Sequence, residues 1–300
     1  MPTETPAITQ AMIDLYDRFT HEGGNRRDLM AGLARLAGGT AAAAVIAPLI
    51  EARADAASFT NDNDARIFTQ RAIWAGANGT TMAGYLVQPR SGAARLPKVM
   101  VIHENRGLTE HIRDVTRRLA MAGFVALAPD FLSPVGETPR TGDGTNSADD
   151  IARQLIAGLD QGQVVANGLA TLKWFEGYDV GRGVPAAVGF CWGGGMVNRL
   201  AVAAGKTLRA GVSYYGPAPT DTRFAGEVKA RMLLQLAGLD ERVNATALPW
   251  AAALKAAGVD TTVHVYDGVN HAFNNDSSAA RYDAKAAALA WQRTVTFLRA

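Results

Sequence analysis

The only cysteine of the chain stands where a nucleophile could be activated. Residues 189–193 read Gly-Phe-Cys-Trp-Gly, the pattern G-x-S-x-G with Cys191 in place of serine. In this pattern the nucleophile sits on a strained turn between a strand and a helix, and the glycines remove Cβ atoms that would collide. The N-terminus of the following helix favours the thiolate form of a cysteine. The motif therefore predicts that Cys191 is a nucleophile rather than an inert core thiol.

Two phosphate-binding motifs also contain closely spaced glycines. A phosphate loop requires Lys and then Ser or Thr after its glycines, whereas Met196 and Val197 stand there. A dinucleotide fingerprint requires G-x-G-x-x-G, and Asn198 occupies the place of its third glycine. Both alternatives are excluded, which leaves the nucleophile pattern.

A cysteine nucleophile requires a base, and the base requires an acid that orients it. His271 and Asp240 each lie in a loop just after an apolar run, where the carboxyl end of a strand would open onto a site. The order nucleophile, acid, histidine along the chain is that of α/β-hydrolases. The other histidines have less suitable places: His21 in the N-terminal segment, His103 before Glu104, His111 on a predicted helix and His264 inside a predicted strand.

Buried strands must position these groups. Continuous apolar runs are typical of strands buried on both faces, and they occur at 98–103, 124–129, 184–190, 211–215, 231–236 and 261–266. Helical patterns lie between or after them, at 109–122, 149–175 (one or two helices), 193–204, 245–257 and 279–298. A hairpin over 67–74 and 82–87, with a turn at Asn78-Gly79, precedes them. The alternation predicts an α/β fold, a mostly parallel twisted sheet with helices on both faces.

Four segments together resemble the dienelactone hydrolase family: 103–107 (His-Glu-Asn-Arg-Gly), 189–194 (Gly-Phe-Cys-Trp-Gly-Gly), 238–240 (Gly-Leu-Asp) and 270–273 (Asn-His-Ala-Phe). The resemblance covers roughly residues 67–298. It implies an α/β-hydrolase fold and a triad of Cys191, His271 and Asp240. It also implies a carboxymethylenebutenolidase-like hydrolase, which cleaves an ester or lactone through a thioester acyl-enzyme.

The resemblance also implies supporting roles. Glu104 would be the partner of the resting thiol, and the backbone N–H groups of Trp192 and Asn105 would form the oxyanion hole. The family's two substrate-carboxylate arginines are absent: Phe131 to Pro134 follow the second-strand Asp130, and Asn275 stands four residues past His271. The resemblance therefore implies the family's catalytic groups for this chain, but it does not imply the family's substrate.

Several side chains are candidates for the substrate pocket. Trp192, Tyr214, Tyr215 and Phe273 would favour a small apolar or aromatic acyl group, and Arg106 could receive an anionic group. For Arg106, however, a solvated place in a loop is the favoured expectation.

Composition excludes other classes of protein. The 300 residues are 48% hydrophobic with a net charge of +2, which does not suit a nucleic-acid-binding protein. One cysteine excludes an internal disulfide and a Cys-cluster zinc site, and no two histidines stand four apart. We therefore expect no metal and no cofactor, a small-molecule substrate as partner, and a monomer or homodimer.

The N-terminal segment, residues 1–57, reads differently from the single catalytic domain expected over 58–300. A short amphipathic helix over 8–19 precedes Arg26-Arg27, the uncharged stretch 36–50 and Ala54-Asp55-Ala56. Paired arginines, an apolar run and a small-x-small site resemble a twin-arginine export signal, which would place the protein in the periplasm once residues 1–56 are removed. The alternative is a retained helical arm, packed on the body or a second subunit, in a cytoplasmic protein. The uncharged stretch would rise only about 22 Å as a helix, too short for a permanent membrane span.

Two further functions stay open. The chain could be a non-catalytic α/β-hydrolase scaffold for binding or assembly, with the N-terminal arm mediating assembly. The same triad could also serve an acyltransferase or a peptidase. Cysteine reactivity separates the scaffold from the enzymes, because a binding scaffold has no reason to keep a reactive thiol.

Overall fold

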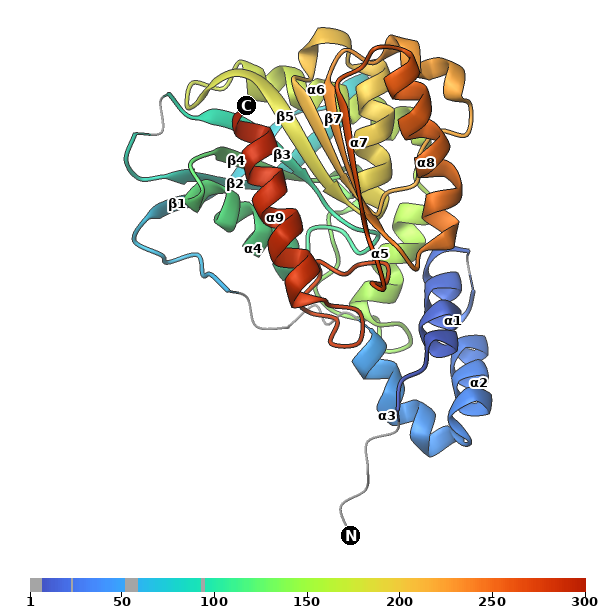
Figure 1. The fold of residues 1–300 in the computed structure, drawn as a ribbon. Coiled ribbons are helices and arrows are strands. Elements are labelled where there is room, and N and C mark those ends of the chain that lie inside the picture. Colours follow the sequence, from blue (N-terminus) through green and yellow to red (C-terminus); the bar gives the residue numbers. More distant parts are fainter. Residues whose placement is uncertain (1–6, 23, 52–58, 93–94) are drawn as a thin grey trace.

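A computed structural model describes residues 7–22, 24–51, 59–92 and 95–300 of the chain. An eight-stranded sheet forms its centre, in the order β1-β2-β4-β3-β5-β6-β7-β8 (Figure 1). The strands are β1 (Ile67–Ala75), β2 (Thr81–Pro89), β3 (Pro97–Ile102), β4 (Val125–Asp130), β5 (Arg182–Phe190), β6 (Ala210–Tyr214), β7 (Arg231–Ala237) and β8 (Thr261–Tyr266). The β1–β2 hairpin is antiparallel, β2 also pairs antiparallel with β4, and the remaining pairs are parallel. The predicted α/β fold class is confirmed.

Helices cover both faces of the sheet, as the strand–helix alternation predicts. On one face lie α4 (Glu110–Met121) and α9 (Ala284–Arg299), whose apolar side chains share a core cluster with Val101 and Val188. On the other lie α6 (Gln161–Glu176), α7 (Trp192–Ala203) and α8 (Glu241–Ala256), packed over Met100 and Leu234. The smaller α5 (Ala148–Ala157) packs with Leu132 beside the sheet end.

Three predicted helices have different boundaries. The helix expected over 245–257 begins earlier, at Glu241, because the Asp240 side chain caps it there by accepting from the Val243 N–H. The pattern over 149–175 divides into α5 and α6, because α5 ends at Gly158 and the Asp160 side chain caps α6 by accepting from the Gln163 N–H. The helix expected from residue 279 begins only at Ala284, because the Asp283 side chain caps it there. The residues before it form turns that run along the end of the sheet.

The N-terminal segment folds into three helices, where the sequence pattern identified one. These are α1 (Gln10–His21), α2 (Arg26–Ala37) and α3 (Thr40–Ile50), which lie below the body in Figure 1. The predicted cleavage site Ala54-Asp55-Ala56 lies outside the described residues. No described helix alone has the length and apolarity to cross a membrane. The pair α2 and α3 has both only when the two helices are counted together, and they meet at a bend of 112°.

Candidate active site

Cys191 lies at the junction of β5 and α7, in the strained backbone conformation that its motif predicts. Its φ is 55° and its ψ is −115°, a region that non-glycine residues rarely adopt. A Cβ on Gly189 would lie 2.1 Å from the Gly193 carbonyl oxygen, and one on Gly193 would lie 2.3 Å from the Ile102 carbonyl oxygen. Glycine is therefore required on both sides of Cys191, and the turn presents its side chain at the carboxyl end of the sheet.

His271 and Asp240 come together from two neighbouring loops. His271 Nδ1 lies 2.5 Å from Asp240 Oδ2 and donates to it, while the other Asp240 oxygen accepts from the Val243 N–H at the start of α8. Both side chains are buried. Among the described residues, the buried Nε2 of His271 has no hydrogen-bond partner.

The two groups shift each other's pKa strongly. Burial alone would raise the pKa of Asp240, but the charge and hydrogen bond of His271 lower it to about 2. Burial would likewise lower the pKa of His271, but the charges of Asp240 and Cys191 outweigh it and raise that pKa to about 10. An acid that stays ionised and fixes the ring of a basic histidine is the arrangement of a general base and its orienting group.

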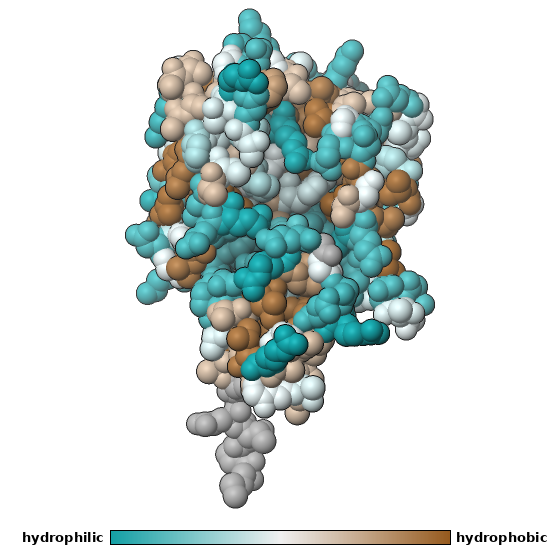
Figure 2. All heavy atoms as spheres, turned by 90° about the vertical axis from the view of Figure 1, so that its right-hand side faces the viewer, coloured by the Kyte–Doolittle hydropathy of each residue, from teal (hydrophilic) through white to brown (hydrophobic). Residues whose placement is uncertain are grey.

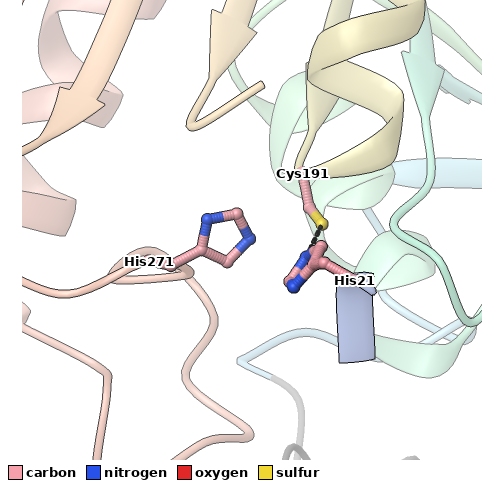
Figure 3. Close-up of side chains that lie close together, drawn as sticks. All are labelled: His21, Cys191 and His271. Atoms are coloured by element: carbon pink, nitrogen blue, oxygen red, sulfur yellow. Dashed lines mark hydrogen bonds between the residues drawn. The ribbon is translucent and has the colours of Figure 1, made fainter. Parts of the chain in front are cut away.

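The partner of the Cys191 thiol comes from the N-terminal segment. His21, the last residue of α1, places its Nε2 3.1 Å from Cys191 Sγ (Figure 3). The rings of His21 and His271 meet edge to face with centroids 4.7 Å apart. Glu104, the thiol partner that the family resemblance implies, instead accepts hydrogen bonds from Tyr215 Oη at 3.3 Å and Asn275 Nδ2 at 2.7 Å.

The two expected oxyanion-hole residues flank the thiol. Trp192 is the first residue of α7, so its N–H precedes the helical hydrogen-bond ladder. Asn105 lines the small cavity at Cys191, and its side-chain Nδ2 donates to the Thr20 carbonyl oxygen at 3.0 Å. The structure thus brings Trp192 and Asn105 to the same end of the sheet, and their donor role stays a prediction.

The aromatic candidates for the substrate pocket lie deeper than expected. Tyr214 is fully buried under α9, where its hydroxyl bonds Thr294 Oγ1 at 2.7 Å, so it does not line the cavity at Cys191. Tyr215 packs against the His271 ring with centroids 5.0 Å apart, and Phe273 packs behind Tyr215 at 5.5 Å. Tyr215 and Phe273 therefore pack behind the His271 ring and support the loop that carries it. Trp192 is partly exposed and stacks on His103 at 5.2 Å.

Arg106 is buried, which corrects the expectation of a solvated loop arginine. Its guanidinium donates to the Tyr16 hydroxyl of α1 and lies 3.6 Å from a carboxylate oxygen of Asp149. Arg281, which sequence analysis did not single out, also lines the cavity, and its guanidinium lies 3.2 Å from the Asp17 carboxylate. Both cations face α1 rather than open solvent.

The cavity at the thiol is nearly filled. It has a volume of about 10 Å³ and is lined by Tyr16, Thr20, His21, Glu104, Asn105, Arg106, Cys191, His271, Ala272 and Arg281. Such a space holds about one water molecule. His21, Cys191 and His271 offer ligand atoms within 4.8 Å of one another, so they could hold a metal ion. The expectation that no metal is required stays a prediction.

Sequence analysis missed His21 because it lies 170 residues from Cys191 in the chain. One signal was available: Asp17 and His21 stand four residues apart, so they share one face of a helix with Thr20 beside them. A polar cluster on an otherwise amphipathic helix indicates contact with polar groups elsewhere, but it does not identify them.

Comparisons with known proteins identify the family and the fold. The family model described as "Dienelactone hydrolase family" matches residues 82–300. A relative from Escherichia coli O157:H7, named "Putative carboxymethylenebutenolidase", is 32% identical, with 74% of this chain and 84% of the relative covered. A "Putative Dienelactone Hydrolase" from Klebsiella pneumoniae subsp. pneumoniae has a solved structure that matches with a TM-score of 0.67 and 27% identity, over 78% of this chain and 98% of that one. A bacterial brefeldin A esterase, at 13% identity, shares the fold with a TM-score of 0.62 over 97% of this chain and 93% of its own.

Proposed function

The chain belongs to the dienelactone hydrolase family, and from this premise we propose that it hydrolyses an ester or lactone bond through Cys191. The observation that carries the proposal is the strained turn that presents Cys191 beside His271, whose ring Asp240 fixes at 2.5 Å. A strained backbone at a buried thiol costs stability, and its use is to aim a nucleophile. A scaffold without catalysis would not require it.

In the first half-reaction, the proton of Cys191 already resides on His271 Nε2, because the raised pKa of His271 favours an imidazolium beside the thiolate. The thiolate attacks the acyl carbon, a C–S bond forms, and the N–H groups of Trp192 and Asn105 stabilise the negative oxygen. The C–O bond then breaks, and the departing alkoxide receives the proton from His271. The alcohol leaves from an ester, whereas from a lactone it stays attached to the acyl group.

In the second half-reaction, water attacks the thioester. His271 takes one proton of that water, the C–S bond breaks, and the proton returns to the sulfur as the carboxylic acid leaves. Asp240 stays ionised throughout and holds His271 in the tautomer whose Nε2 faces the thiol. No cofactor takes part in these steps.

The substrate need not carry a carboxylate. The family's two arginines are replaced in this chain. The loop after Asp130 begins with Phe131, and Asn275 stands four residues past His271. The Asn275 side chain is engaged with Glu104, and Phe131 packs against Trp192 with ring centroids 5.7 Å apart. The reacting bond is thus an ester or lactone, and the groups around it are identified by measuring hydrolysis of a panel of esters and lactones with and without a carboxylate.

Substitution of the nucleophile tests the proposal. We expect Cys191→Ala to abolish hydrolysis of p-nitrophenyl acetate, because no other group in the site can form the acyl-enzyme. Cys191→Ser is expected to retain a weak activity, since serine is a poorer nucleophile without thiolate character. Turnover by Cys191→Ala at the wild-type rate, with an unchanged melting temperature, would refute the mechanism. Product analysis with added alcohol separates hydrolysis from acyl transfer.

A further inference from the structure

Helix α1 closes the site that the proposed function requires to be open. Its residues Tyr16, Thr20 and His21 form one wall of the cavity at Cys191, whose volume is about 10 Å³. Even an acetyl ester exceeds the space of one water molecule. Substrate can therefore reach Cys191 only when α1 moves away from the body.

We propose that α1 is a lid on the active site and that His21 is a positioning residue, which engages the Cys191 thiol by a hydrogen bond while the lid is closed. The proposal rests on the proposed function because a lid has a use only if a substrate must reach Cys191. The access of any reagent to the Cys191 thiol, however, can be measured without a substrate.

The hydrogen bonds of His21 define the direction of its bond to the thiol. Its Nδ1 lies 2.7 Å from the Asp17 carbonyl oxygen, which can only accept, so Nδ1 carries the ring proton. Nε2 of the neutral ring is then an acceptor, and at 3.1 Å the Cys191 S–H must donate to it. The thiol is therefore engaged with α1 while the lid is closed.

The groups around His21 keep it neutral. Burial, followed by the charges of His271 and Arg242, holds the pKa of His21 well below its ordinary value, while Asp17 and Asp240 act in the opposite direction. These charges come from the loops after β7 and β8, from the first turn of α8 and from α1 itself. The neutral His21 therefore accepts from the thiol rather than donating to it.

In the closed state, the hydrogen bond of the thiol runs to His21 rather than to His271. His271 Nε2 lacks a partner among the described residues, although the reactive atoms of His21, Cys191 and His271 lie within 4.8 Å of one another. Figure 3 shows His271 reaching toward Cys191 from its own loop while the dashed bond runs from the thiol to His21. When α1 moves away, the Cys191 sulfur keeps His271 as its neighbour and loses its bond to His21.

The N-terminal helices can leave as a unit because their apolar core is their own. Met12, Tyr16, Leu33 and Ile46 belong to a cluster that, among the described residues, receives only Ala280 from the body. Besides the contacts of His21, the contacts with the body include five polar ones: Gln10 with Asn270, Tyr16 with Arg106, Asp17 with Arg281, the Thr20 carbonyl with Asn105, and the Ile50 carbonyl with Ser278.

Water can replace polar contacts of this kind when the lid opens. Figure 2 shows hydrophilic side chains gathered across the junction between the N-terminal helices, at the bottom, and the body above them. Polar junctions are typical of parts of a chain that move relative to one another.

Alkylation of the single cysteine tests the proposal in the full-length protein. Iodoacetamide reacts with the thiolate, and the mass gain reports Cys191 alone, because the chain has no other thiol. We expect His21→Ala to be alkylated about tenfold faster than the wild type, the factor expected for the loss of one net hydrogen bond. His21→Gln should restore slow alkylation, since its side-chain amide reaches as far as Nε2 and can accept the S–H bond.

Arg18→Ala is the matched control, because Arg18 is exposed on the same helix and does not line the cavity at Cys191. Equal alkylation rates in the wild type and His21→Ala would overturn the proposal, as would equally fast rates in His21→Ala and His21→Gln. Alkylation needs no substrate. If the alkylation rates are as expected but no ester is hydrolysed, the proposed function is contradicted and the lid proposal is not.

The lid must be present in the working protein. Mass spectrometry of protein purified from its native host is expected to find a chain that still contains α1 and His21. A mature chain that begins after residue 56 would overturn the proposal, because export processing would then have removed the lid.

Discussion

At the scale of single residues, Asp240 and His271, the proposed orienting acid and base, affect stability through their shifted pKa values. The pKa of His271 rises from 6.5 to about 10 on folding, so the protonated ring stabilises the folded state below pH 6.5. That contribution is lost as the pH rises through about 10. Asp240 acts in the opposite sense: its pKa falls from 3.8 to about 2, and its contribution is lost as the pH falls through that range.

Asp240→Asn tests this pair. We expect the variant to lose much of the decrease in unfolding free energy that the wild type undergoes between about pH 6.5 and 10. Its kcat/KM should fall on the order of 10³-fold, because the ring is no longer held in its productive tautomer. Thermal unfolding across pH and ester hydrolysis measure the two effects.

Asp221→Asn is the control, since Asp221 forms an exposed ion pair with Arg223 away from the site. The pair's assigned role would be contradicted if Asp240→Asn and Asp221→Asn had the same pH profile of stability and the same kcat/KM.

At the scale of elements, the β5–α7 junction requires its glycines. A Cβ at Gly189 would meet the Gly193 carbonyl oxygen at 2.1 Å, and this neighbour is backbone that cannot rotate away. We expect Gly189→Ala to cost about 3 kcal/mol of stability, a melting temperature lower by on the order of 10 °C, together with loss of hydrolysis. Calorimetry and the ester assay measure both.

Gly226 offers the comparison. A Cβ there has no neighbour within 4 Å, so Gly226→Ala should stay within about 0.5 kcal/mol of the wild type. If Gly189→Ala melted at the same temperature as Gly226→Ala and kept its activity, the close approach of β5 and α7 would not be needed to build the turn.

At the scale of the whole molecule, the described residues form a body around the sheet and a group of N-terminal helices with a separate apolar core. Regions joined by few apolar contacts open locally at less than the global free energy of unfolding. We expect the amides of α1 to exchange with solvent at least about 100-fold faster than those of β5. Hydrogen exchange followed by mass spectrometry measures this difference.

The Asp17–Arg281 pair, at 3.2 Å, is one of the contacts that hold α1 closed. Asp17→Ala should therefore speed the exchange of α1 further, by about tenfold, and leave β5 unchanged. Asp14→Ala is the control, because Asp14 accepts its hydrogen bond from Gln10 within α1. If the two variants exchanged alike, Arg281 would not anchor the lid.

The sequence by itself determined the catalytic end of the sheet. The glycines around Cys191 have one steric reason, and Asp240 and His271 follow buried strands whose carboxyl ends share an edge. Local spacing and strand order suffice for such predictions, so the hairpin, the parallel strands and the meeting of these three side chains could all be expected in advance.

Only the tertiary structure decided what covers that end. The bond of His21 to Cys191, the burial of Arg106 under Tyr16 and the engagement of Glu104 with Asn275 each join residues that are far apart in the chain. An amphipathic helix pattern states that one face must be covered, but it does not state by what. That choice depends on how polar groups meet across a surface, which no spacing along the chain encodes.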